Sequence, residues 1–181
     1  MLIKIIFLWL LMCVILGLTV WFIIQLFVVM FAGWGKAIYA PSFDKDIALM
    51  HDLDLQSGKT IIDLWCGDGK ALRFFARRYG LKGLWYDCNL QAIRYGKLIN
   101  FLTKQSVRLI HSDFSAADFG QADYIYLYLF PEQILDIEDR VFSSIKKGTV
   151  VITNTFHFGK HTPFQIVKNR KGKGRICLYR K

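Results

Sequence analysis

The decapeptide IIDLWCGDGK, from Ile61 to Lys70, places a tight glycine turn directly after a buried apolar run. The β-branched residues of the run predict a strand over residues 60–65. The following residues, 69–80, carry apolar side chains at helical spacing and end at a glycine, which predicts a helix. A strand, a glycine turn and a helix in this order are typical of the first unit of an open α/β sheet.

The same alternation continues along the chain. Further strand-like runs and segments of helical periodicity follow one another, with strands at 82–87, 106–113, 122–130 and 149–156 and helices at 90–102 and 131–148. Residues 163–181 break this rhythm, because two short strand-like runs flank the turn NRKGKG. The pattern predicts an α/β fold in which helices cover both faces of a mostly parallel sheet, ended by an antiparallel hairpin.

The N-terminal part of the chain has a different composition. Residues 5–35 contain no charged residue and are dominated by large apolar side chains. About 20 such residues cross the hydrocarbon core of a bilayer, which is about 30 Å thick. We therefore expect one transmembrane anchor in residues 1–35 and one domain in residues 36–181. A cleaved signal peptide is the alternative, but its apolar region is usually only about 7 to 15 residues long.

The charge of the chain indicates what surrounds it. The net charge is +10, and of the 24 Lys and Arg residues all but Lys4 follow the apolar run. The positive-inside tendency then puts the C-terminal domain on the cytoplasmic side of a bacterial inner membrane or an organelle equivalent, next to anionic lipid. Nucleic acid is the competing partner for a basic chain, and it is disfavoured because no nucleic-acid-binding motif accompanies the charge.

Cysteine and histidine spacing argue against disulfide and metal chemistry. The four cysteines show no paired spacing, which fits a reducing compartment. His157 and His161 are four residues apart, but Gly159 lies between them and Pro163 follows, so a helical metal-binding pair is not expected. We predict no metal site.

Glycines and carboxylates gather at the predicted strand ends. Gly67 and Gly69 allow a sharp turn and a close approach of a ligand to the backbone. Asp87 ends the second predicted strand, where it can accept hydrogen bonds from ribose hydroxyls, and Asp113 ends the third, within reach of an adenine amino group. Asp68 inside the turn is unfavourable for a diphosphate but suits a cationic ligand, and S-adenosylmethionine carries a sulfonium and an ammonium.

These residues carry a resemblance to a known family. DLWCGDG (63–69) resembles the first motif of class I S-adenosylmethionine-dependent methyltransferases, and YDCN (86–89) resembles their second motif. The ordered segments YAPS, DLWCGDGK, YDCNLQAI, SDF, YLYLFP and HTP are similar, more narrowly, to the membrane-anchored lysine methyltransferase family that includes the ATP synthase c-subunit lysine methyltransferase. The resemblance implies a Rossmann-like, seven-stranded fold and S-adenosyl-L-methionine as cofactor.

The resemblance also implies roles for individual residues. The cofactor-binding set would comprise Asp63, Cys66, Gly67, Asp68 and Gly69 around the methionine part, Asp87 on the ribose, and Asp113 with Phe114 beside the adenine. Trp65 stands where the family usually has its first glycine. Beyond the fourth strand, Glu132 is the candidate proton acceptor or orienting group, and Tyr128 a wall of the acceptor pocket.

The resulting prediction is a membrane-anchored S-adenosylmethionine-dependent methyltransferase that modifies a lysine of a membrane-associated protein. Methylation of a small molecule or a lipid is a second enzymatic interpretation. A non-catalytic, cofactor-binding assembly factor is a third, because the indole of Trp65 lies in the first motif.

Overall fold

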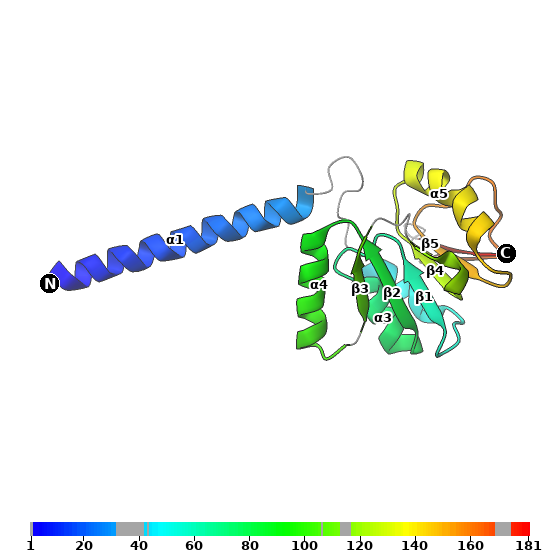
Figure 1. Cartoon of the computed structure of the whole chain (residues 1–181), viewed down its shortest axis with the longest axis horizontal. Coiled ribbons are helices and arrows are strands. Elements are labelled where there is room, and N and C mark those ends of the chain that lie inside the picture. The colour runs from blue at the N-terminus through cyan, green and yellow to red at the C-terminus, as the bar shows by residue number, and fades with distance from the viewer. Residues whose placement is uncertain (1, 32–41, 43, 106, 113–116, 169–174) are drawn as a thin grey trace. The chain divides into compact units, whose positions relative to one another are not determined.

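The computed structural model describes residues 2–31, 42, 44–105, 107–112, 117–168 and 175–181. The chain divides into two compact units, Met1–Tyr39 and Ala40–Lys181. The described part of the first unit is a helix, α1, Leu2–Phe31 (Figure 1). Its segment Lys4–Phe27 has 24 residues with a mean hydropathy of 2.7 and is long and apolar enough to cross a membrane. At about 1.5 Å per residue it would exceed the roughly 30 Å of a hydrocarbon core.

The second unit is an α/β domain. Its strands are β1 Thr60–Asp63, β2 Lys82–Asp87, β3 Arg108–His111, β4 Tyr124–Leu127, β5 Val150–Asn154, β6 Gln165–Lys168 and β7 Arg175–Arg180. Its helices are α2 Asp44–Leu49, α3 Lys70–Tyr79, α4 Leu90–Leu102 and α5 Pro131–Ser144, with 3₁₀ turns η1 Met50–Asp52 and η3 Phe119–Gln121.

The strands form one sheet in the order β3-β2-β1-β4-β5-β7-β6. The ladders from β3 through β5 are parallel, and β7 is antiparallel to both β5 and β6. This confirms the predicted Rossmann-like sheet of seven strands with an antiparallel C-terminal hairpin. The chain moves outward from β1 in one direction to β3 and in the other through β4, so the strand order reverses between β1 and β4. Open α/β sheets bind their ligands at the carboxyl ends of the strands beside such a point.

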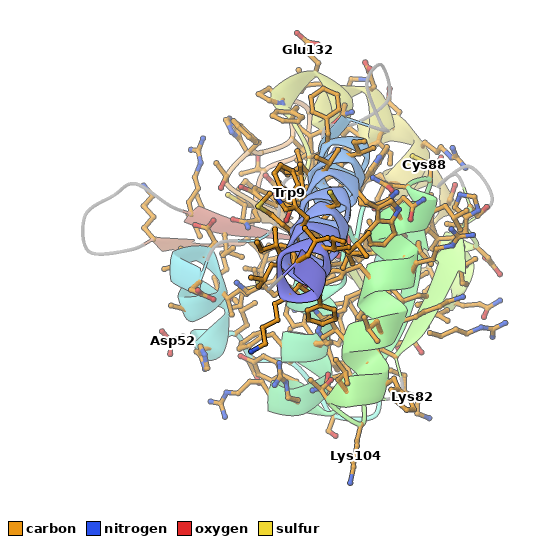
Figure 2. The ribbon with its side chains drawn as sticks, turned by 90° about the vertical axis from the view of Figure 1, so that its left-hand side faces the viewer. Trp9, Asp52, Lys82, Cys88, Lys104 and Glu132 are labelled. Carbon is orange, nitrogen blue, oxygen red and sulfur yellow. The ribbon has the colours of Figure 1, made fainter. Side chains whose placement is uncertain are left out.

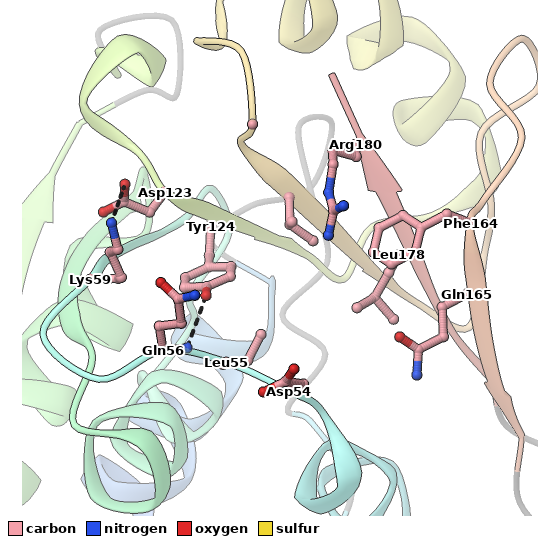
Figure 3. A pocket seen from close by; sticks show the side chains of 12 residues that line it. Asp54, Leu55, Gln56, Lys59, Asp123, Tyr124, Phe164, Gln165, Leu178 and Arg180 are labelled. Atoms are coloured by element: carbon pink, nitrogen blue, oxygen red, sulfur yellow. Dashed lines mark hydrogen bonds and ion pairs between the residues drawn. The ribbon is translucent and has the colours of Figure 1, made fainter.

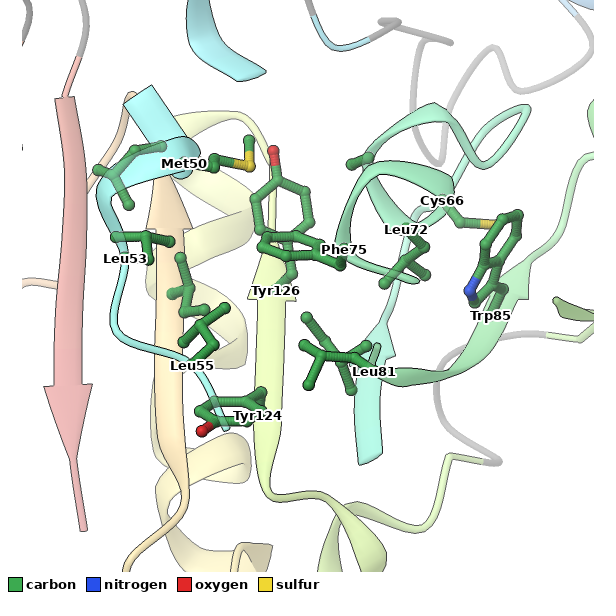
Figure 4. Close-up of a cluster of buried hydrophobic side chains, with 14 of the residues drawn as sticks. Met50, Leu53, Leu55, Cys66, Leu72, Phe75, Leu81, Trp85, Tyr124 and Tyr126 are labelled. Carbon is green, nitrogen blue, oxygen red and sulfur yellow. The ribbon is translucent and has the colours of Figure 1, made fainter. Parts of the chain in front are cut away.

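Alternation along the strands builds one core on each face of the sheet. Ile61 belongs to the core beneath α2, η1, α3 and α4, whereas the next residue, Ile62, belongs to the core beneath α5. Figure 4 shows the first core, where Phe75 of α3 meets Tyr126 of β4 with ring centroids 5.4 Å apart. These two layers hold the carboxyl ends of β1, β2 and β4 at one edge of the sheet (Figure 1).

Some predicted boundaries were wrong. The strand expected over 60–65 ends at Asp63, because the side chain of Asp63 accepts a hydrogen bond from the backbone N–H of Trp65 at 3.2 Å and the chain turns there. The strand expected over 122–130 is limited to Tyr124–Leu127. The short elements α2, η1 and η3 were not predicted, since segments of three to six residues show no periodicity.

Candidate active site

The glycine turn lies between β1 and α3 and is fixed by its own hydrogen bonds. The backbone N–H of Gly69 donates to the carbonyl of Cys66 at 2.8 Å, and that of Lys70 to Oδ1 of Asp68 at 3.2 Å. Gly67 and Gly69 have φ angles of 53° and 83°, in the left-handed region that favours glycine. The predicted turn is therefore confirmed, and its backbone is bare of side chains at both glycines.

Two neighbours press against this turn. A Cβ atom on Gly69 would lie 1.6 Å from Cζ3 of Trp85, a fully buried side chain of β2. A Cβ atom on Gly96 of α4 would lie 2.7 Å from the carbonyl oxygen of Asp68. The contact of Gly96 was missed from the sequence. Its signal was a glycine inside a predicted helix, which usually has a packing reason.

Asp87 ends β2 and ties the turn to the start of α4. Its Oδ2 accepts the backbone N–H of Gly67 at 2.8 Å, and its Oδ1 accepts that of Asn89 at 2.7 Å. Burial raises the pKa of this carboxyl group, and the two backbone hydrogen bonds and His111 counter that rise in part. A carboxylate has about four acceptor positions, so Asp87 keeps capacity for further hydroxyl donors.

Asp63 ends β1, the neighbouring strand. Its side chain is only 3% exposed, and Trp65 donates the one hydrogen bond that the described residues make to it. Burial raises the pKa of Asp63 to about 8, the amide of Trp65 opposes the rise, and the charge of Asp87 adds to it. A buried carboxyl group with this pKa is complementary to a cation that would stabilise its ionised form.

Asp68 is already paired. Nη2 of Arg73 lies 3.0 Å from Oδ2 of Asp68, and Nη1 of the same guanidinium donates to the Asp68 carbonyl at 2.6 Å. Arg73 is 5% exposed, so this ion pair is shielded from water. Because Arg73 compensates the charge of Asp68, attraction of a cationic ligand falls mainly on Asp63 and Asp87. The sequence analysis missed Arg73, whose signal was a basic residue beside Leu72 on the apolar side of the predicted helix.

The side chains of Cys66 and Trp65 point to the two cores. Cys66 is 7% exposed and lies beside Trp85 in the first core (Figure 4). Burial, followed by the charges of Asp63 and Asp87, raises the pKa of its thiol. Its sulfur also donates to the carbonyl of Gly67 at 3.7 Å, so the thiol is held between Trp85 and the turn. Trp65 is half-buried and packs against the second core.

A polar network that the sequence did not predict lies beside Asp63. The buried hydroxyl of Tyr126 accepts a hydrogen bond from Nδ2 of Asn154 at 3.0 Å and is also hydrogen-bonded to the side chain of Ser42. Burial raises the pKa of Tyr126, and the charges of Asp63 and Asp46 raise it further. The ring of Tyr126 lies in the core, and its hydroxyl joins β4 to the end of β5.

The two predicted catalytic residues lie after β4 in different surroundings. Tyr128 is half-buried, and burial together with the charge of Asp46 raises its pKa. Glu132 is exposed in the first turn of α5. Figure 2 shows Glu132 and Cys88 towards the upper end of the view and Lys82 and Lys104 towards the lower end. In the part of the chain that is described, no hydrogen bond or ion pair joins Glu132 to the carboxylates above.

Asp113 and Phe114 were predicted to flank an adenine, and both lie outside the described residues. The neighbouring backbone is described, and the N–H of Ser112 donates to the carbonyl of Asp87 at 3.1 Å. The end of β3 is thus next to the end of β2, as the sheet order requires.

A cavity of about 430 Å³ lies at the opposite edge of the sheet (Figure 3). Two of its lining residues, Lys59 and Asp123, precede β1 and β4 and form an ion pair of 3.9 Å. A third, Tyr124, accepts the backbone N–H of Gln56 at 3.0 Å. Because this cavity is at the amino ends of the parallel strands, it is separate from the glycine turn and the carboxylates of β1 and β2.

The described residues fit a ligand with cationic and hydroxyl groups. Asp63 is a buried carboxyl group without a cationic partner among the described residues, and Asp87 retains acceptor capacity at the next strand end. Gly67 is half-buried and carries no side chain, so a ligand can approach its backbone closely, whereas Gly69 is buried against Trp85. S-adenosylmethionine, with its ammonium, sulfonium and ribose hydroxyls, has the complementary groups.

Comparison with known proteins agrees with this geometry. The sequence model of the ANTKMT methyltransferase domain matches residues 63–165, more than half of the chain. Curated proteins give no match to the sequence.

Solved structures show the same fold. An RNA methyltransferase from Salinibacter ruber, in complex with S-adenosyl-L-homocysteine, superimposes with a TM-score of 0.71 at 20% identity, covering 78% of this chain and 93% of that one. A SAM-dependent methyltransferase from Geobacter sulfurreducens, in complex with the same compound, has a TM-score of 0.58 at 20% identity and covers 72% of this chain and 54% of that one.

Proposed function

The chain belongs to the ANTKMT methyltransferase domain family of class I S-adenosylmethionine-dependent methyltransferases, and we propose that it methylates a lysine of a membrane-associated protein. One observation carries the placement of the reaction. Asp63 and Asp87, two buried carboxyl groups, end neighbouring strands beside the glycine turn, and the described residues supply neither with an ion-pair partner.

S-adenosylmethionine would supply, when bound, a methyl group on a sulfonium sulfur. A neutral amine would attack the methyl carbon in line, and the sulfur would leave as the thioether of S-adenosylhomocysteine. In this proposal the carboxylate of Asp63 faces the cationic methionine part, and Asp87 accepts hydrogen bonds from the ribose. Gly67, which is half-buried and has no side chain, lets the ligand approach the turn, and Gly69 lets the turn pack against Trp85. Asp113 and Phe114 keep their predicted place beside the adenine. The protein then contributes mainly alignment and an electrostatically arranged site.

A lysine acceptor must reach the site as a neutral amine. Removal from water lowers the pKa of an amine, and a nearby carboxylate can draw the charged form in and take up its proton. Asp46 is 4% exposed, and burial, followed by the charge of Asp46, raises the pKa of Tyr128. The hydroxyl of Tyr128 therefore keeps its proton and can orient the amine. We assign the acceptor side of the site to these two residues, with Glu132 as an orienting group at its exposed rim.

The apolar helix supports a membrane location. Lys4–Phe27 is long enough to span a bilayer, and the proposal places the α/β domain on the cytoplasmic side because nearly all basic residues follow the helix. Tethering a domain raises its effective concentration towards proteins of the same membrane. A membrane-associated acceptor follows from that argument.

The cofactor site can be tested by calorimetry on the full chain in lipid nanodiscs. Asp87→Asn removes the carboxylate but keeps its volume. Hydrogen bonds to a charged group are each worth about 1.5–3 kcal/mol, so the affinity for S-adenosylhomocysteine should fall about ten- to hundredfold. The matched control is Asp123→Asn, at the opposite edge, where the carboxylate accepts the backbone N–H of Thr60 at 2.9 Å. Equal affinities of the wild type and Asp87→Asn would disprove the ribose role.

The acceptor class can be tested with methyl-labelled S-adenosylmethionine and a membrane extract. Label in a protein band, recovered as methyl-lysine after acid hydrolysis, supports the proposal. Label in the lipid phase or in small molecules would show the second enzymatic interpretation to be correct. Cofactor binding without transfer to any fraction would instead indicate a binding protein.

A further inference from the structure

The outer face of α4 exposes large apolar side chains. Its inner face is buried against the sheet through Ala92, Ile93, Gly96 and Asn100. On its outer face the exposed fractions are 51% for Tyr95, 52% for Leu98, 81% for Phe101 and 64% for Leu102. These positions recur at three- and four-residue spacing, so they form one stripe along the helix. We call this stripe, Tyr95–Leu98–Phe101–Leu102, the α4 stripe.

Basic residues accompany the α4 stripe. Residues 90–108 contain four basic residues and no acidic one. Arg94 and Lys97 lie on α4 itself, Lys104 and Arg108 follow it, and all four are exposed. Lys82, at the start of β2, is exposed and lies towards the same end of the view as Lys104 (Figure 2). The α4 face therefore combines apolar side chains with a uniformly positive charge.

Helix α5, on the other face of the sheet, provides an internal comparison. Its exposed side includes Glu132, Asp136 and Asp139. Leu135, 51% exposed, is the one large apolar side chain of α5 on that side. That is the ordinary pattern of a helix that faces water. The composition of the α4 face is thus a local property rather than a consequence of the basic chain as a whole.

We propose that the α4 stripe binds the surface of an anionic lipid bilayer. Apolar residues flanked by Lys and Arg on one helix face are the features by which a helix lies in a membrane interface. Each basic residue near an anionic leaflet adds about a five-fold gain in binding. A protein partner fits less well, since lysine is depleted from the centres of protein interfaces. The inference goes beyond the proposed function, although it shares with it the membrane setting of the chain.

The orientation has a consequence for the acceptor. Helix α4 begins beside Asp87, through the cap at Asn89, and runs back towards the amino ends of the strands. With α4 lying on the lipid surface, the carboxyl ends of the strands, where the cofactor site is proposed, face parallel to the plane of the membrane. A helix is about 10 Å wide, so the site would lie about that far above the lipid surface. The enzyme would then reach a lysine at the membrane–water boundary rather than one on a distant soluble domain.

Photo-crosslinking of the full chain in nanodiscs tests this proposal. A photoreactive phenylalanine analogue is introduced at Phe101. The matched control is the same analogue at Phe164, which is 51% exposed and directly precedes β6, the outer strand on the side of the sheet opposite β3. The expected result is a lipid adduct at position 101 that exceeds that at position 164 about tenfold in anionic nanodiscs. A change of Arg94 and Lys97 to Gln should lower this adduct several-fold while leaving the thermal midpoint unchanged.

Three results would overturn the proposal. Equal lipid adducts at positions 101 and 164 would show that the α4 stripe is not selective for lipid. An adduct from position 101 to protein, including a second copy of the chain, would identify a protein interface instead. An adduct that is the same in neutral and anionic nanodiscs would exclude the electrostatic part. None of these readouts requires methyl transfer, so failure here is distinct from failure of the proposed function.

Discussion

Replacement of Asp63 by Asn should stabilise the protein and weaken its cofactor binding. The two side chains have nearly the same volume, and the Oδ1 atom of Asn can still accept the backbone N–H of Trp65. What the substitution removes is an ionisable group whose pKa burial raises from 3.8 to about 8. The wild-type chain therefore has to bind a proton at Asp63 when it folds at neutral pH.

The size of the effect follows from the two pKa values. One pKa unit corresponds to about 1.4 kcal/mol, so folding at about pH 7 costs the wild type about 4 kcal/mol at Asp63. At about pH 5 the same cost is about 2 kcal/mol. Because the folded-state pKa lies above the unfolded one, the folded state binds more protons between them. Stability consequently falls as pH rises through this window and levels off above the folded-state pKa.

Urea unfolding of the full chain in detergent micelles, followed by near-UV circular dichroism, measures the difference between wild type and Asp63→Asn. The stability of the variant relative to wild type should increase by about 2 kcal/mol from about pH 5 to about pH 7. Calorimetry should show that the same variant binds S-adenosylmethionine more weakly. A stability difference that does not change with pH would refute the assignment of a raised pKa to Asp63, and an unchanged affinity would refute its role opposite the cation.

Two further substitutions test the turn and a second buried carboxylate. Gly69→Ala should destabilise the domain by about 3 kcal/mol, because the left-handed backbone disfavours alanine and the new Cβ would lie 1.6 Å from Trp85. The control is Gly58→Ala, because Gly58 has a similar φ of 77° and a Cβ there would meet no atom within 4 Å. Urea unfolding should show a loss of stability of about 1 kcal/mol for the control, from the backbone alone. Equal losses of stability in the two variants would argue against the Trp85 contact. Glu138→Gln should cost about 2 kcal/mol, since Glu138 accepts hydrogen bonds from three successive backbone amides and from His161. Burial raises the pKa of Glu138, but these hydrogen bonds outweigh it and hold the pKa below its ordinary value. The loss of stability in Glu138→Gln should therefore be complete above the ordinary pKa and should vanish as the pH falls through the lowered pKa. A loss of stability that persists in acid would contradict this origin.

The sequence was sufficient to predict the features that depend on local pattern. Strand ends were located by where an apolar run gives way to a polar residue, and this pattern placed Asp87 correctly at the end of β2. Asp63 was expected inside a strand over residues 60–65 and became a site candidate only through the family resemblance. The glycine turn was equally predictable, because left-handed backbone at Gly67 and Gly69 leaves few other residues possible. The alternation of strands and helices predicted the mostly parallel sheet and its antiparallel C-terminal hairpin, whereas the order of the strands came from the structure.

The features that sequence analysis missed depend on contacts between distant segments. Arg73 could not be paired with Asp68 from spacing alone, since the pairing requires the turn to fold back over the first turn of α3. The hydroxyl of Tyr126 meets Asn154 across 28 residues, and no periodicity encodes that contact.

The surroundings of an aspartate differ between the two ends of the parallel strands, and this difference supports the proposed position of the cofactor site. At the amino edge Asp123 has Lys146 at 2.9 Å and Lys59 at 3.9 Å. Burial acts to raise the pKa of Asp123, but the amide of Thr60 and the two lysines hold it below its ordinary value. At the carboxyl edge Asp63 has no such partner among the described residues, and its pKa is raised. Lysines neutralise Asp123 at the amino ends of the strands, whereas Asp63 at the carboxyl ends is buried without such a partner among the described residues. The buried carboxyl group of Asp63 destabilises the fold, and a cationic ligand would stabilise its ionised form.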